Sequence, residues 1–130
     1  MMSKEIEIVR VEAYEEIAME FQAVQALELD EALQDCGIDD IELRKKICRR
    51  FAFGMGNFLD QYFFKVNGKP FYPVLCFSEG FIHEESDGVP EKLHLPTAEY
   101  EFHSSADGCV ESYFDGDAVV IGIVGDEDGI

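Results

Sequence analysis

The sequence lacks tryptophan, has no long apolar run and contains few basic residues. A membrane-spanning helix needs roughly 20 consecutive, mostly apolar residues, and no stretch of the chain approaches that length. The N-terminal residues also lack the apolar core of a secretory signal peptide. These absences predict a cytoplasmic protein without a membrane span.

Metal-ligand spacing is also missing. The four cysteines form no Cys-x-x-Cys pair, and the three histidines lack the spacing of a zinc site. Cysteines scattered through an apolar chain are mostly small buried side chains with reduced thiols. We therefore predict no metal and no cofactor. The residues concerned are Cys36, Cys48, Cys76 and Cys109, with His83, His94 and His103.

Acidic residues outnumber basic ones by 28 to 10, which gives a formal net charge of −18. Such a field repels the phosphates of nucleic acids and of anionic membranes, so we expect neither as a partner. The charge favours a cationic protein partner instead. The alternative is that the acidic surface serves only solubility.

The C-terminal part carries the most one-sided charge. Residues 93–130 contain nine acidic residues and no lysine or arginine. We expect a cationic partner to dock on predicted strands there, with an affinity that falls as salt rises. In composition alone, the chain resembles small inhibitor and immunity proteins that cap basic toxins or nucleases. The predicted partner-binding residues are Glu99, Glu101, Glu111, Asp115 and Asp117.

The most regular stretch predicts a helix over residues 40–60. Asp39 and Asp40 offer an N-cap, and apolar residues then recur at intervals of three and four. Arg44 lies near the middle of this apolar stripe, so we expect it to pair with a carboxylate from the first helix. The stripe consists of Ile41, Leu43, Ile47, Cys48, Phe51, Ala52, Met55, Phe58, Leu59 and Tyr62.

Three positions on this helix are unusual. Phe53 falls on its opposite, polar side, where either the loop of residues 79–97 covers the ring, or a second copy of the chain does, or the ring is simply solvent-exposed. In the second case the protein is a homodimer. Gly54 and Gly56 each weaken a helix by about 1 kcal/mol relative to alanine, which indicates either close approach of another element or an early helix end.

A β-hairpin is predicted directly after this helix. Asn67-Gly68 between two apolar runs is the strongest short signal for a two-residue hairpin turn. The two strands would be residues 62–66 and 69–77. Pro70 and Pro73 lack a backbone N–H, which predicts an edge or bulged position for the second strand.

The first part of the chain predicts another helix, over residues 4–36. Residues 5–11 also alternate between apolar and polar side chains, so a short strand is the alternative there. The apolar face breaks at Glu28, and Asp30 then offers a cap for a separate short helix that Gly37 closes. We therefore expect a kinked or two-piece helix.

The remainder of the chain has the pattern of a loop followed by strands. Residues 79–97 are polar and predict a long loop with one short strand near Leu93–Leu95. Three strands are expected after it, at Glu99–His103, Cys109–Phe114 and Ala118–Val124. The last of these is almost wholly apolar, so it should be central and covered on both faces.

Helices followed by hairpin-linked strands are typical of the α+β class. We predict a single α+β domain over residues 1–130. In this domain, two N-terminal helices pack on one face of an antiparallel sheet of about five strands.

No motif identifies an enzyme, because the sequence contains no nucleophile elbow, phosphate loop or metal signature. The leading prediction is a small acidic binding protein that docks a cationic protein. The alternative is a ligand-binding or catalytic domain with a pocket between the helices and a concave sheet. The residues expected to line that pocket are Arg44, Tyr100 and Tyr113.

Overall fold

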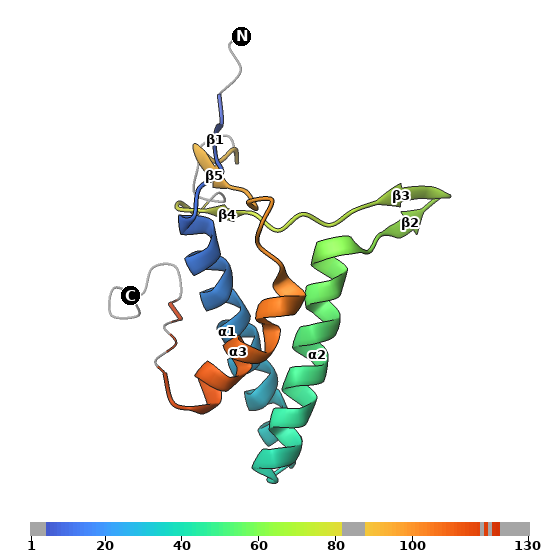
Figure 1. The fold of residues 1–130 in the computed structure, drawn as a ribbon, viewed down its shortest axis with the longest axis vertical. Coiled ribbons are helices and arrows are strands. Elements are labelled where there is room, and N and C mark those ends of the chain that lie inside the picture. Colours follow the sequence, from blue (N-terminus) through green and yellow to red (C-terminus); the bar gives the residue numbers. More distant parts are fainter. Residues whose placement is uncertain (1–4, 82–87, 118, 120, 123–130) are drawn as a thin grey trace. The chain divides into compact units, whose positions relative to one another are not determined.

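The computed structural model describes residues 5–81, 88–117, 119 and 121–122. Within these residues it forms three helices and five strands (Figure 1). None of the described helices combines the length and the apolar character needed to cross a membrane. In chain order the elements are β1 (Glu7–Val9), α1 (Ala13–Asp35), α2 (Ile41–Gln61), β2 (Phe64–Val66), β3 (Lys69–Phe71), β4 (Phe77–Ser78), β5 (Lys92–His94) and α3 (Phe102–Phe114).

Residue contacts divide the chain into two compact units. The first unit combines Met1–Ile17 with Val74–Tyr100, and the second combines Ala18–Pro73 with Glu101–Ile130. The first unit holds a three-stranded sheet in the order β1-β5-β4, in which β1 and β5 are parallel and β4 and β5 are antiparallel. Tyr14 is fully buried in this unit, and its hydroxyl donates a hydrogen bond to the Leu75 carbonyl at 2.6 Å.

The second unit holds α2, α3, the rest of α1 and a two-stranded hairpin of β2 and β3. The buried cluster at its centre consists of small side chains, which lets the helices approach closely. Gly56 of α2 marks a close approach to α3, because a Cβ atom there would lie 2.6 Å from the backbone of His103 in α3. The buried cluster contains Ala26, Cys48, Ala52, Ala106 and Val110.

The predictions of α2 and of the hairpin turn are confirmed, although the second strand ends at Phe71 and not at residue 77 as expected. Asp40 caps α2, since its carboxylate accepts hydrogen bonds from the backbone N–H groups of Glu42 at 3.0 Å and Leu43 at 3.3 Å. At the turn, Asn67 and Gly68 both adopt positive φ, of 52° and 78°. Positive φ at both central residues is the geometry of a type I′ turn, which matches the twist of the flanking strands.

The N-terminal prediction is confirmed in its alternative form, because residues 7–9 form a strand and α1 begins only at Ala13. The expected kink or break of this helix is wrong. α1 continues through Glu28 to Asp35, and Asp30 pairs with α2 instead of capping a new helix. Gly37 follows the helix end with φ of 88°, as expected of a C-terminal glycine.

The prediction of one antiparallel sheet of about five strands is wrong. The described strands form separate sheets of three and two strands, and one pair is parallel. Residues 102–114 form α3 where two strands were expected, because the apolar residues Phe102, Ala106, Cys109 and Val110 recur at helical spacing and are all buried. The expected strand Ala118–Val124 lies largely outside the described residues.

Candidate functional site

A buried carboxylate joins the three helices of the second unit. Asp30 is 3% exposed and accepts hydrogen bonds from Arg44 Nε at 2.6 Å, Gln34 Nε2 at 3.0 Å and the Tyr113 hydroxyl at 2.8 Å. Arg44 also donates to the backbone carbonyls of Ile38 and Asp39. The predicted pairing of Arg44 with a carboxylate of the first helix is therefore confirmed.

The polar groups of this cluster are bonded to one another, which leaves few of them to bind a ligand. Burial raises the pKa of Tyr113 well above its usual range, and the hydrogen bond to the Asp30 carboxylate adds to the rise. Arg44 and Tyr113, two of the residues expected to line a pocket, thus meet on a carboxylate of the chain itself. The third, Tyr100, belongs to the other unit, where its ring lies edge-on to Tyr14 at 6.2 Å.

A histidine and an aspartate meet at the N-terminus of α3. The Asp60 carboxylate accepts hydrogen bonds from the backbone N–H groups of Phe102 and His103, both at 2.8 Å, and from Nδ1 of His103. An aspartate in this position orients the imidazole, as in hydrolase triads. In the described part of the chain, however, no hydroxyl or thiol is bonded to His103. The pair therefore acts as a cap for α3, which the helix dipole favours.

The described residues offer neither an activated buried cysteine thiol nor a grouped set of metal ligands. Burial raises the pKa of the Cys48 and Cys109 thiols to about 11, so neither thiol is activated. Cys36 and Cys76 are exposed and free. Over residues 5–81 and 88–117, no group of three or more histidine, cysteine or acidic side chains is arranged to hold a metal ion.

The predicted acidic docking residues do not lie on strands. Glu101 and Asp115 flank α3 at its two ends, and Glu111 within α3 forms an ion pair with Arg49 of α2. Asp117 accepts a hydrogen bond from the Ser112 hydroxyl at 2.6 Å. Glu99 belongs to the other unit. Docking of a cationic partner on these five residues stays a prediction.

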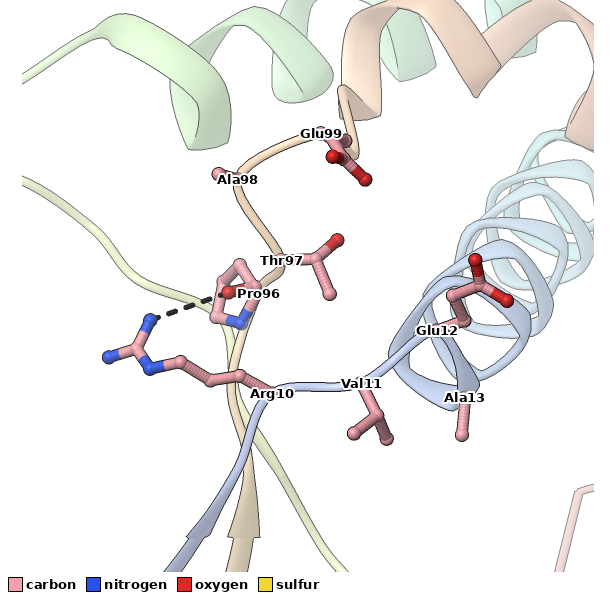
Figure 2. Close-up of a pocket in the computed structure, with 8 residues that line it drawn as sticks. All are labelled: Arg10, Val11, Glu12, Ala13, Pro96, Thr97, Ala98 and Glu99. Carbon is pink, nitrogen blue, oxygen red and sulfur yellow. Dashed lines mark hydrogen bonds between the residues drawn. The ribbon is translucent and has the colours of Figure 1, made fainter.

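An open hollow of about 740 Å³ lies at the start of α1 in the first unit. Figure 2 shows Arg10 extended toward the Pro96 carbonyl, to which it donates at 3.4 Å, while the carboxylates of Glu12 and Glu99 lie away from it. Thr97 contributes a buried hydroxyl without a hydrogen-bond partner among the described residues. Arg10, Glu12 and Glu99 are exposed, so no buried charge is present to hold a ligand in place.

The aromatic arm, residues 62–72, is the most unusual surface. Every residue of this segment is exposed, although five are aromatic: Tyr62, Phe63, Phe64, Phe71 and Tyr72. Residues 61–78 also contain two lysines and no acidic residue, in a chain with 28 acidic residues. The arm is therefore both apolar and locally cationic.

The rings of the arm are ordered in two layers. On one face, Phe64 lies between Phe58 of α2 and Phe71 of β3, with both pairs of ring centroids 6.2 Å apart. On the other face, Phe63 meets Tyr72 at 5.4 Å. These contacts stiffen the hairpin, since aromatic pairs add about 0.5–1.5 kcal/mol beyond the area they bury.

The outer face of α2 adds a second apolar surface. Leu43, Ile47 and Phe51 lie one turn apart and line a shallow groove of about 450 Å³ with Lys46 and Arg50. Leu43 and Phe51 are 43% and 45% exposed. Leu43 and Phe51 were predicted to belong to a stripe facing the core. That prediction is wrong for these two residues, because close packing at Gly56 brings the small residues Cys48 and Ala52 to the core instead.

Phe53 is exposed within its own unit, and the expected cover of its ring, by the loop of residues 79–97 or by a second copy, stays a prediction. Its ring is 47% exposed and lies edge-on to the His103 ring at 6.1 Å. This contact with α3 was not anticipated from the sequence, because α3 was expected to be two strands.

Comparison with models of protein families, with curated proteins and with solved structures gives no match for this chain. The surfaces described above are therefore the basis for a functional assignment.

Proposed function

We propose that the chain is a non-enzymatic protein-binding module that docks its partner on the aromatic arm and the outer face of α2. The observation that carries this proposal is the exposure of all residues from 62 to 72, five of which are aromatic. Exposure of so many rings to water raises the free energy of a monomer. A partner that covers the rings removes this cost, so binding is favoured.

The size of the surface supports docking. The five rings of the arm are 43–64% exposed, and a phenylalanine or tyrosine buries about 150–250 Å² when fully covered, so the arm presents roughly 500 Å² of ring surface. This ring surface is divided between the two faces of the hairpin. For comparison, the largest apolar patch on a typical monomer is about 300–600 Å² and is often functional. The groove of α2 enlarges the surface further.

The structure of the arm gives a second argument. A two-stranded hairpin is only marginally stable alone in water, whereas three or more strands or a packed face make a stable sheet. The strand residues of β2 and β3 are exposed on both faces of the hairpin. A partner that covers the arm would supply the missing packing.

The charge of this surface restricts its partner. Lys46, Arg50, Lys65 and Lys69 all belong to the proposed docking surface. A strongly cationic protein would be repelled there. The expected cationic partner would therefore need the acidic residues elsewhere in the chain, and it remains a separate proposal.

Photo-crosslinking in cells that make the protein tests this function. A photoreactive phenylalanine analogue replaces Tyr72, which is 64% exposed, and in a control it replaces the exposed Glu28 of α1. We expect a discrete crosslinked protein band from position 72 that is absent from position 28. Equal labelling at both positions, or no band, would reject the docking function.

A further inference from the structure

The two outer edges of the aromatic arm differ in their hydrogen-bonding groups. β2 and β3 pair in the register Phe64↔Phe71, Lys65↔Pro70 and Val66↔Lys69. In a hairpin with a two-residue turn, the pair next to the turn and every second pair after it exchange backbone hydrogen bonds. The backbone groups of the middle pair, Lys65 and Pro70, therefore point outward.

Only one of these edges can take up another strand. Pro70 has no N–H, so the outer edge of β3 lacks its central donor, and Pro73 follows shortly after. The outer edge of β2 offers both the N–H and the C=O of Lys65. An added strand would thus pair with β2 and leave β3 at the outside.

We propose that a second copy of this chain supplies that strand, so that two arms join through their β2 edges around a two-fold axis. The result is a four-stranded antiparallel sheet in the order β3-β2-β2-β3. This inference rests on the proposed docking function and names its partner. A two-fold arrangement uses the same edge of both copies, so it closes after two chains.

One register fits the side chains best. The outward-pointing backbone groups of β2 and the residue before it are those of Lys65 and Phe63. Exchange of hydrogen bonds between Lys65 of one copy and Phe63 of the other centres the axis on Phe64. Each Lys65 then lies opposite a phenylalanine ring and not opposite another lysine, which avoids like-charge repulsion and allows a cation–π contact.

Charge favours the arm as the contact between two copies. Two chains that each carry a net charge of −18 repel one another. Contact through the aromatic arm, residues 62–72, places no acidic residue of the arm in the interface. Salt screens the remaining repulsion, so self-association should strengthen as ionic strength rises. An ionic complex between this chain and a cationic partner would weaken under the same change.

The small contact area predicts a weak dimer. Pairing through β2 covers only part of the roughly 500 Å² of ring surface on each arm, because Phe71 and Tyr72 lie on the β3 side, at the outside of the four-stranded sheet. The interface is therefore smaller than the roughly 1,200 Å² of the smallest standard specific interfaces. The proposal therefore predicts a dimer that forms with rising protein concentration and dissociates on dilution.

Disulfide trapping tests the register. Both variants are made in a chain in which the exposed Cys36 and Cys76 are replaced by serine, while the buried Cys48 and Cys109 remain. Phe64→Cys places two thiols across the axis, where the Cα atoms of a pair without mutual hydrogen bonds are about 4.5 Å apart, within disulfide range. The control is Phe71→Cys, which removes a similarly exposed ring from β3.

The control thiols lie three strand spacings apart in the proposed sheet, about 14 Å, which is beyond the reach of a disulfide. Under mild oxidation we expect Phe64→Cys to form a covalent dimer at least about tenfold faster than Phe71→Cys. Circular dichroism must show equal helix content in both variants. Light scattering of the unmodified protein, over rising concentration and salt, gives an independent measure of association.

The outcomes separate this inference from the docking function. Equal trapping at both positions, or a chain that stays monomeric at all concentrations, would overturn pairing through β2. If the chain is monomeric and position 72 crosslinks a different protein in cells, the docking function holds and the self-pairing is wrong. If position 72 crosslinks nothing, the docking function itself fails.

Discussion

Asp30 is the residue on which the packing of the second unit depends most. It is almost fully buried, and its ion pair with Arg44 has a donor–acceptor distance of 2.6 Å, with side-chain exposures of 5% and 12%. Removing one partner of a buried ion pair leaves an uncompensated charge. We expect Asp30→Ala to lower the free energy of unfolding by about 3–5 kcal/mol, measured by urea denaturation.

Asp35→Ala is the matched control, because Asp35 is exposed at the end of the same helix. It should change the free energy of unfolding by less than about 0.5 kcal/mol. Equal effects of the two substitutions would show that the Asp30 cluster is not a main support of the fold.

Tyr113 gives this cluster a pH dependence. Burial and the neighbouring Asp30 raise its pKa in the folded chain above the value of about 10 that a tyrosine has when unfolded. The stability from the neutral hydroxyl is therefore complete below pH 10 and is lost as the pH rises above it. Tyr113→Phe should flatten the alkaline decline in unfolding free energy, whereas Tyr62→Phe, at an exposed site, should leave it unchanged. If the free energies of unfolding of wild type and Tyr113→Phe fall in parallel at alkaline pH, Tyr113 is not the source of the decline.

At the scale of elements, the crossing of α2 and α3 depends on one glycine. An alanine gains about 1 kcal/mol over glycine from helix propensity. At Gly56 the added Cβ would meet the His103 backbone at 2.6 Å, whereas at Gly54 it would meet only the flexible end of Arg50 at 2.9 Å. We expect Gly56→Ala to destabilise the chain by about 1–3 kcal/mol.

Gly54→Ala should be neutral or stabilising by up to about 1 kcal/mol, since the arginine side chain can move aside. Thermal melts of the two variants give the comparison. A stabilising Gly56→Ala would mean that α3 is not held against α2 at this point.

The elements that sequence predicts well are those with local signals. Asp40 provides the cap of α2, and Asn67-Gly68 specifies its hairpin turn, so both could be placed without tertiary information. The Arg44 pairing was also predictable, because a cation in an apolar stripe needs a carboxylate.

α3 was missed because Ser104 to Gly108 has the composition of a turn. The helical spacing of Phe102, Ala106 and Val110 was present in the sequence and was the signal that should have been weighed more. Its cap comes from Asp60, more than forty residues earlier in the chain, which no local pattern reveals.

The docking surface was only partly visible in the sequence. Apolar residues cover a wide arc of α2, and periodicity alone does not show which side of that arc faces the core. The approach of α3 at Gly56 decides this, and it leaves Leu43 and Phe51 outside. Likewise, the hairpin was expected to belong to the sheet of about five strands, and the structure instead exposes both faces of the hairpin.

At the scale of the whole molecule, the net charge of −18 should dominate solution behaviour. Mutual repulsion of carboxylates destabilises the compact state, and salt screens it. We expect the melting temperature to rise with added sodium chloride and with moderate acidification from neutral pH. A melting temperature that changes with neither salt concentration nor pH would contradict this expectation.

Backbone amide exchange at Lys65 tests the account most directly, because it reads the free edge of the arm in the unmodified protein. In the isolated chain the Lys65 N–H points to solvent, whereas that of Val66 is held by Lys69 across the hairpin. We predict that exchange at Lys65 slows as protein concentration and salt increase, while exchange at Val66 changes little. Lys65 exchanging at the rate of an unprotected amide under all conditions, with Val66 protected, would contradict pairing of two arms through β2.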